Sequence, residues 1–327
     1  MSFQKIGYQP QVIRFLQRAL VTGQIAHAYC FYGPAGTGKK KMALELAKAI
    51  NCEHQTADAC DDCPTCRQIE HGNHPDIVIL QPDGSFIKID QLRALQEQFQ
   101  YRAATGIMRV VIIEQAEKMR PEAANSLLKF LEEPVSPMVA ILLTEQIQAI
   151  LPTVLSRCQK VRFLELHPNI RLEKLKEQGV PPHLARILAH IPSELPEEGE
   201  DRLSPKVVED WCQRLITWNG DILTKGSMAL LEIQYEWLQT AMEENQLSLI
   251  LDLLLLWLRE LLYYQLGQKA FLFPDWEQEC RKQAFIWEQP RLLHAMETVM
   301  YARSQLTKFV QPQAILEQMV LKIQEGP

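Results

Sequence analysis

The chain has 327 residues and a mass of 37.7 kDa, enough for two compact domains, or three if they are small. Its composition, 47% hydrophobic and 23% charged, is near the average for soluble globular proteins and excludes wholesale disorder and fibrous repeats. Lys and Arg number 34 against 40 Asp and Glu, so the net charge is −6 and the chain as a whole does not attract polyanions. Any contact with nucleic acid must therefore be local.

The N-terminal segment and the most apolar stretch of the chain indicate the compartment in which the protein works. The first ten residues contain no apolar segment of the kind that a signal peptide needs. The most apolar stretch, 247–266, includes Asp252, Arg259 and Glu260, so it lacks the run of about 18 uncharged residues that a membrane span requires. We expect a buried helix there and a cytoplasmic protein without membrane contact. Its eight cysteines should then be reduced or metal-bound, because disulfides are rare in that compartment.

The first half of the chain alternates short β-branched runs with helical patterns, which predicts an α/β fold with a parallel, helix-covered sheet. Strands are expected at 28–32, 77–80, 110–113, 139–143 and 161–163. Between them, Met42, Leu46 and Ile50 share one helix face, and a second helix should begin at Pro121 and end at Pro134.

The second half is helix-rich, with no further strand pattern after residue 163. We expect an α/β domain at 1–166, followed by two all-α domains at 167–224 and 225–327. The stretch 192–205 holds three prolines, one glycine and five acids against one arginine, a composition that predicts an exposed loop.

The run Gly-Pro-Ala-Gly-Thr-Gly-Lys follows the first strand and opens a helix, the context that a phosphate-binding loop (P-loop) needs. Its candidate phosphate ligands are Gly33, Gly36, Gly38 and Lys39. Backbone amides at the helix start would cradle an anion, and the lysine would reach the outer phosphates. The alternative is a plain strand-to-helix turn. An active loop has Ser or Thr at the next position to ligate Mg²⁺, whereas this chain has Lys40, whose charge would repel the metal.

The end of the 110–113 strand gives a second indication. Glu114 stands where a Walker-B acid would hold Mg²⁺, or it is simply a capped strand end. Gln115 follows in place of a second carboxylate and cannot take a proton from an attacking water. Together with Lys40, this predicts an ATPase fold that has lost its own catalysis, with ATP binding weak or absent.

Four cysteines with the spacing C-x7-C-x2-C-x2-C lie between the helix after the loop and the next strand. They are Cys52, Cys60, Cys63 and Cys66. Four thiolates at short spacing in a cytosolic protein suit a closed tetrahedral Zn²⁺ site, structural because no position is left open for water. Alternatives are a redox pair, free buried cysteines, or replacement of one ligand by His54, His71 or His74.

Two further residues bear on nucleotide chemistry. Arg157 lies in a short helical segment before the last strand, where an arginine is commonly a surface salt-bridge donor. In a ring of P-loop subunits this region faces the neighbour's nucleotide, and a guanidinium there stabilises phosphoryl-transfer charge in trans. Thr144, at a strand end beside the loop, is a candidate phosphate sensor or an ordinary strand terminus.

Several motifs together carry a family resemblance. They are His27-Ala28-Tyr29, the four-cysteine insert, the segments 72–76 and 89–93, the run Asn-Ser-Leu-Leu-Lys-Phe-Leu-Glu-Glu-Pro ending at 134, and Leu155-Ser156-Arg157-Cys158. The chain resembles the delta-prime family of subunits of the bacterial DNA polymerase III clamp loader, within the AAA+ ATPases. The match is close over about 3–163. Beyond residue 163 the chain agrees with the family only in its domain pattern, which is a helical lid at 167–224 followed by a helical collar at 225–327.

The resemblance implies a role in an assembly. A subunit of this family sits at one end of a five-membered complex with ATP-hydrolysing gamma/tau and with delta. It implies that Arg157 reaches the neighbour's ATP, that collar helices hold the ring, and that the complex opens a sliding clamp around primed DNA. That complex belongs to a DNA-directed DNA polymerase holoenzyme, a nucleotidyltransferase. Lys40 and Gln115 fit a stator without intrinsic ATPase activity, while Gly33 and Lys39 leave weak nucleotide binding open.

Two other functions fit parts of the sequence. A gamma/tau-like ATPase with its own turnover would need Mg²⁺-dependent hydrolysis, against which Lys40 and Gln115 argue. A zinc-bearing nucleic-acid adaptor unconnected with a polymerase is disfavoured by the net acidity and by the lack of an aromatic and basic stripe.

Overall fold

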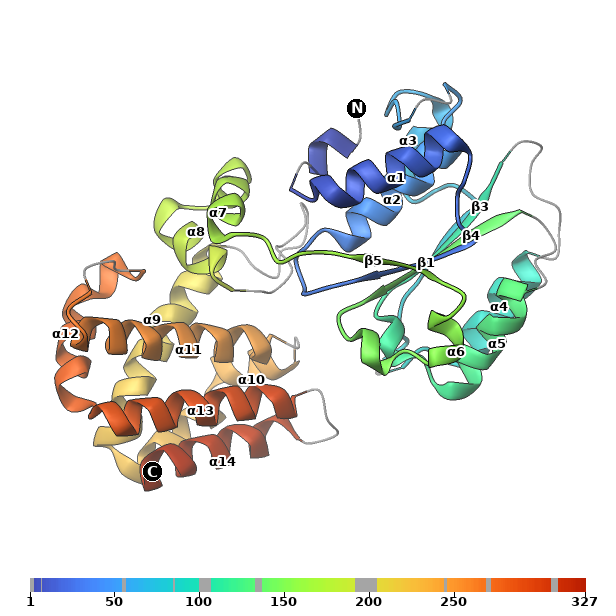
Figure 1. Cartoon of the computed structure of the whole chain (residues 1–327). Coiled ribbons are helices and arrows are strands. Elements are labelled where there is room, and N and C mark those ends of the chain that lie inside the picture. The colour runs from blue at the N-terminus through green and yellow to red at the C-terminus, as the bar shows by residue number, and fades with distance from the viewer. Residues whose placement is uncertain are drawn as a thin grey trace. The chain divides into compact units, whose positions relative to one another are not determined.

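The computed structural model describes residues 3–6, 8–54, 57–84, 86–99, 107–132, 137–191, 205–243, 246–268, 272–306 and 311–327. The chain folds into two compact units, Met1–Leu166 and His167–Pro327 (Figure 1). Pro134 and residues 192–204 of the expected loop lie outside the described residues.

A parallel sheet of five strands forms the centre of the first unit (Figure 1). The strands are β1 (Ala28–Tyr32), β2 (Ile77–Leu80), β3 (Arg109–Ile113), β4 (Met138–Thr144) and β5 (Gln159–Arg162). They lie in the order β2-β3-β4-β1-β5, and every neighbouring pair is parallel. The parallel sheet expected from the sequence is confirmed, and the loops after β1, β2 and β3 all leave its carboxyl edge.

The largest boundary difference concerns β5, which begins two residues before the expected strand at 161–163 and ends at Arg162. It is an edge strand, and three of its four residues are exposed. β5 has no continuous apolar run, because only Val161 of its four residues is buried; β2, the edge strand on the other side of the sheet, is apolar throughout. Gln159 and Lys160 therefore gave no strand signal.

Helices cover both faces of the sheet, because side chains alternate along each strand. Tyr29 and Phe31 of β1 face one core cluster, while Ala28 and Cys30 face the other. The first face carries α1 (Pro10–Thr22), α2 (Lys39–Asn51) and α3 (Pro64–Glu70); the second carries α4 (Ile89–Gln98), α5 (Pro121–Glu132) and α6 (Pro152–Leu155). Short 3₁₀ turns are η1 (Phe3–Ile6), η2 (Ala116–Lys118) and η3 (Ile147–Ala149).

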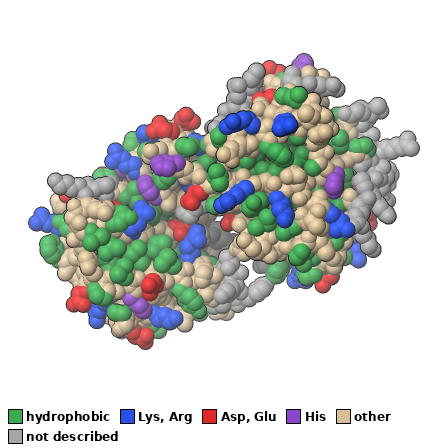
Figure 2. Space-filling view, in the orientation of Figure 1, with side chains coloured by type: hydrophobic (Ala, Val, Ile, Leu, Met, Phe, Trp, Pro, Cys, Tyr) green, Lys and Arg blue, Asp and Glu red, His purple; other side chains and the backbone are tan. Residues whose placement is uncertain are grey.

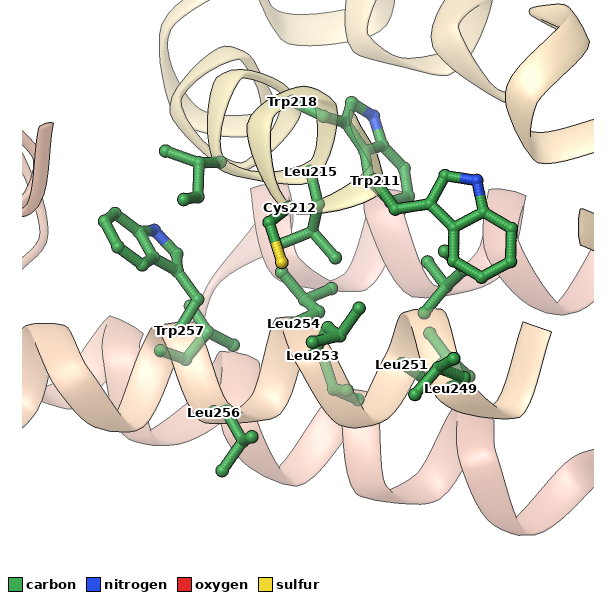
Figure 3. Close-up of a cluster of buried hydrophobic side chains, with 14 of the residues drawn as sticks. Trp211, Cys212, Leu215, Trp218, Leu249, Leu251, Leu253, Leu254, Leu256 and Trp257 are labelled. Carbon is green, nitrogen blue, oxygen red and sulfur yellow. The ribbon is translucent and has the colours of Figure 1, made fainter. Parts of the chain in front are cut away.

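The described part of the second unit is helical, with one buried cluster that extends from Leu175 to Ile323. Its helices are α7 (Pro168–Glu177), α8 (Pro182–Ala189), α9 (Pro205–Thr224), α10 (Glu236–Glu243), α11 (Leu247–Gln265), α12 (Glu277–Ile286), α13 (Gln289–Gln305) and α14 (Pro312–Glu325), with 3₁₀ segments η5 (Gly226–Gln234) and η6 (Pro274–Trp276). In Figure 3, Cys212 and Leu215 of α9 point towards Leu254 of α11.

The stretch expected to be a buried helix is α11, and the expectation is confirmed. Its buried Asp252 is paired with Arg303 of α13, with Nη2 3.0 Å from Oδ2. Because a buried carboxylate without a partner is costly, this pair explains how a charge is tolerated inside the bundle. None of the described helices combines the length and apolarity that crossing a membrane requires. The division of the second unit at residue 224 stays a prediction.

Candidate functional site

The loop between β1 and α2 is shaped by two glycines that other parts of the chain approach closely. Gly33 has φ 151°, and a Cβ there would lie 2.3 Å from the carbonyl oxygen of Phe163. Gly38 has φ 81°, and a Cβ there would lie 2.3 Å from the hydroxyl of Tyr8. Only glycine fits at these two positions without strain or displacement of a neighbour. The loop therefore adopts a tight, preformed path into α2.

Lys39 closes the loop from inside. Its Nζ donates hydrogen bonds to the carbonyl oxygens of Gly33 at 2.8 Å and Pro34 at 2.6 Å, and only 7% of the residue is exposed. Thr37 also donates to Pro34, through Oγ1 at 2.9 Å. These two acceptors are neutral carbonyl oxygens, and the ammonium lies at the start of α2, where the helix dipole also favours anions.

Lys40 and Glu114 form an ion pair at the carboxyl edge of the sheet. Nζ of Lys40 lies 3.1 Å from Oε1 of Glu114. Gln81, which directly follows β2, donates from Nε2 to the same oxygen at 3.1 Å. A divalent ion could reach this carboxylate only by displacing the ammonium or by lying beside a like charge. The carboxylate of Glu114, which was expected to face a metal, instead pairs with the ammonium of Lys40.

Gln115 occupies a turn. Its backbone is left-handed, with φ 49°, and its side chain is exposed. Its carbonyl oxygen accepts a hydrogen bond from the amide of Lys118 at 2.8 Å, which starts η2. Gln115 therefore turns the chain into η2 and carries no second carboxylate.

Thr144 lies beside the loop, at the end of β4. Its Oγ1 accepts a hydrogen bond from the amide of Gln146 at 3.1 Å, and its carbonyl oxygen accepts one from the amide of Gly33 at 3.2 Å. The side chain is buried. Thr144 thus caps the turn after β4 and ties that turn to the loop.

Arg157 lies on the surface just after α6. Its Nη1 donates to the carbonyl oxygen of Thr153 at 3.0 Å and lies 3.5 Å from Oγ of Ser156. A carbonyl at the end of a helix is a favourable partner for a cation. The guanidinium is exposed, and its hydrogen bond to Thr153 holds it against α6.

The four cysteines of the insert meet at one point, with all four sulfur atoms within 4.8 Å of one another. Cys52 ends α2, Cys60 lies in the following loop, and Cys63 and Cys66 stand at the start of α3. The Sγ atoms of Cys60 and Cys66 are 3.9 Å apart. A tetrahedron with Zn–S bonds of about 2.3 Å places its sulfurs about 3.8 Å apart, so this donor set fits Zn²⁺.

Backbone amides prepare Cys60 to carry a negative charge. Hydrogen bonds from the amides of Cys63 at 3.2 Å and Asp62 at 3.4 Å lower its pKa to about 6. Burial raises the pKa of the Cys66 thiol. Among the described residues, this cluster of four cysteines includes no histidine, and Nδ1 of His74 instead accepts from the amide of Asp76 at 3.2 Å.

Lys48 fastens the insert to α2. Its buried ammonium lies 2.9 Å from a carboxylate oxygen of Glu45, 2.9 Å from one of Asp61, and against Glu70 of α3. Burial alone would lower the pKa of Lys48, but hydrogen bonds to Glu70, Asp61 and Glu45 together raise it. The cluster therefore links three segments around one positive charge.

Lys48→Met is expected to lower the free energy of unfolding by about 3 kcal/mol, the low end of the cost of breaking a buried ion pair. The cost is limited because burial already raises the pKa of Glu45, which takes up a proton when its partner is lost. Urea denaturation measures the change. Lys41→Met, on the exposed side of the same helix, should change it by less than about 0.5 kcal/mol. Equal effects of the two variants would contradict the role given to Lys48.

The chain is similar to known proteins of one family. The family model described as "DNA polymerase III, delta subunit" matches residues 8–167. DNA polymerase III subunit delta' of Bacillus subtilis is 37% identical over 319 residues, which cover 97% of each chain. The chain belongs to the delta' family of DNA polymerase III subunits. The resemblance drawn from the motifs is confirmed, and similarity to delta' extends through the helical second unit.

Other relatives match less of the chain. DNA polymerase III subunit tau of Bacillus subtilis is 35% identical over 162 residues, 49% of this chain and 29% of that protein. A solved structure of a DNA polymerase III gamma subunit-related protein from Thermotoga maritima covers 96% of this chain and 99% of its own, with a TM-score of 0.46 and 17% identity. The delta' match from Bacillus subtilis thus covers 97% of the chain, whereas the tau match from the same organism covers 49%.

Proposed function

We propose that the chain is a stator of the DNA polymerase III clamp loader. It assembles with ATP-hydrolysing gamma/tau and with delta, and helps to load a sliding clamp onto primed DNA during replication. Membership of the delta' family supports the place in the assembly. The observation that supports a lack of ATP hydrolysis by this chain is the Lys40–Glu114 ion pair. The ammonium of Lys40 pairs with the carboxylate that would otherwise face Mg²⁺.

In this proposal Arg157 is an arginine finger that acts on the neighbouring subunit's ATP. Its exposure supports the role, and the hydrogen bond to Thr153 fixes part of its direction. Thr144 is a candidate phosphate sensor only if its hydroxyl turns from the Gln146 amide towards a ligand. The first unit is proposed to be an AAA+-type P-loop domain, followed by a lid at 167–224 and a collar at 225–327 that holds the ring.

The zinc ion is proposed to be structural. Four cysteine ligands would complete a tetrahedron and leave no site for water, so the ion would carry no reaction. Its task would be to hold the insert between α2 and α3 in one conformation.

DNA is proposed to be contacted only through the assembled complex. On the face drawn in Figure 2, the Lys and Arg side chains of the coloured residues lie in separate small groups and form no continuous stripe. A protein that binds nucleic acid on its own usually concentrates these charges on one face. The net charge of −6 favours a subunit over an independent adaptor.

The second candidate function is a gamma/tau-like motor, which the retained loop glycines, Lys39 and the similarity to tau favour. The two functions differ in turnover by the isolated chain. We expect the purified full-length chain with ATP and Mg²⁺ to release no phosphate above the level of a Lys39→Ala variant. A coupled phosphate-release assay measures this. Turnover that disappears in Lys39→Ala would instead favour the motor.

A further inference from the structure

We propose that the outer face of α1 is a docking surface for an acidic, amphipathic segment of a partner protein. The face is formed by Arg14, Phe15, Arg18 and Val21, which are all exposed. Such a surface would act on the full chain alone. It therefore goes beyond the proposed function and depends neither on the loop before α2 nor on assembly.

The first support is the distribution of charge along the sequence. The first 44 residues contain six Lys and Arg and no Asp or Glu, and the first acid of the chain is Glu45. All 40 acids lie from that point onwards, together with the other 28 of the 34 Lys and Arg. A net-acidic chain thus keeps its N-terminal end free of acids, and α1 lies within that end. A partner of opposite charge would be attracted to this end first.

The second support is that α1 presents its cations and its exposed apolar side chains on one side. Residues four and seven positions apart share a helix face, so Arg14, Arg18 and Val21 lie in line, and Phe15 lies beside them. Phe15 is 40% exposed and Val21 is 72% exposed. The opposite side of the helix is buried in the core of the first unit. The outer face is therefore fixed before any ligand arrives.

The third support is that both guanidinium groups are available to a ligand. Nε of Arg14 donates to the carbonyl oxygen of Pro10 at 3.3 Å, which is a neutral acceptor. Across the described part of the chain, neither Arg14 nor Arg18 forms an ion pair with a carboxylate. A guanidinium offers a planar fork of N–H donors that matches a carboxylate. Two forks one helical turn apart would match two acids one turn apart on a partner helix.

The make-up of the face favours an acidic protein segment over nucleic acid. Proteins that bind DNA strongly make about 6–10 phosphate contacts, whereas this face offers two arginines. Phe15 is the one aromatic side chain of the four, and Val21 has no ring on which a base could stack. Exposed apolar side chains between cations instead suit a helix that carries both acids and apolar residues.

The experiment is a fluorescence anisotropy titration of a labelled synthetic peptide with the full-length chain. The peptide has about 20 residues, long enough to form a helix, with glutamates spaced four apart on one side and leucines beside them. We expect a dissociation constant on the order of 100 μM or tighter at low salt. Binding should weaken at high salt, because exposed ion pairs are screened. A peptide of the same composition in scrambled order should bind at least about tenfold more weakly.

Variants of α1 test the face itself. Arg14→Gln combined with Arg18→Gln should weaken binding about tenfold, because two exposed ion pairs are lost. Val21→Ser should weaken it about threefold, because less apolar area is covered. The matched control is Arg93→Gln, which removes the same charge from an exposed arginine of α4 on the other face of the sheet and should bind like the wild type. An unchanged melting temperature confirms that each variant is folded.

Three results would overturn the inference: no binding of the ordered peptide, equal binding of the scrambled peptide, or an Arg93→Gln variant as weak as the double arginine variant. A DNA duplex of about 20 base pairs is titrated in parallel. If the DNA bound more tightly than the peptide and the double variant lost that binding, the face would be assigned to nucleic acid instead. Because these titrations use the chain alone, their failure would leave the stator role intact.

Discussion

Arg157→Ala is expected to lower the clamp- and DNA-stimulated ATPase of a reconstituted assembly while the chain stays folded, zinc-loaded and assembled. An arginine finger in trans is worth on the order of 10³ to 10⁵ in rate at its own site. The loss for the whole assembly should be smaller, because the other interfaces keep their own fingers. Steady-state phosphate release and a fluorescence assay of clamp loading measure the two effects.

Arg157→Lys should rescue little, because an ammonium lacks the planar fork that bridges phosphate oxygens. Arg162→Ala is the matched control: it removes an exposed arginine of β5 from the same unit. It should leave both rates near those of the wild type. If both Arg157 variants loaded clamps at the wild-type rate within confirmed assemblies, Arg157 would be a surface residue only.

Removal of zinc should have the second largest effect, a loss of structure that is confined to the insert. Protein purified without added metal is expected to contain about one zinc per chain, and structural Zn²⁺ in small peptides contributes about 10–16 kcal/mol of apparent binding free energy. Cys60→Ser or a strong chelator should therefore open the segment between α2 and α3 to protease. The sheet should stay folded, because the insert is an excursion between α2 and β2.

Elemental analysis and limited proteolysis test this expectation. Cys158→Ser is the matched control, since Cys158 is buried in the same unit but lies outside the cysteine cluster. It should keep its zinc and its resistance to protease. A fully folded chain without metal, with an insert as protected as before, would contradict a structural zinc site.

The sequence predicted β1 to β4 well because each is largely a continuous apolar run, and this includes β2, which lies at an edge of the sheet. β1 and β2 begin and end where expected, at 28–32 and 77–80. β5 was misplaced because, unlike β2 at the other edge, it carries exposed polar residues such as Lys160. The cysteine spacing also predicted a meeting of four sulfurs, because residues so near in sequence need only a short loop to converge.

The polar contacts of the site could not be read from the sequence in the same way. Lys40, Gln81 and Glu114 are far apart in the chain and meet only because parallel strands end at one edge. Gln81 directly follows β2, which is the one signal that would have marked it. Tyr8 gave no signal, since its contact with Gly38 depends on how the N-terminal segment returns to the loop.

Lys48 was missed for a different reason. A lysine in a helix is normally a solvated residue, and the periodicity of α2 does not reveal that the insert folds back over it. Its burial depends on Asp61 and Glu70, and nothing in the sequence of their segments indicates that they contact α2. Burial of a charge is thus visible only after the fold is known.

The central claim, that the chain is a non-hydrolysing member of a clamp loader, is tested most directly by reconstitution with purified gamma/tau, delta, clamp and primed DNA from the same host. Native mass spectrometry and a clamp-loading assay are made with and without the chain. The account predicts that the chain enters the complex, that loading depends on it, and that Lys39→Ala in this chain leaves the ATPase rate of the complex unchanged. Failure to enter the complex, or equal loading without the chain, would contradict the account.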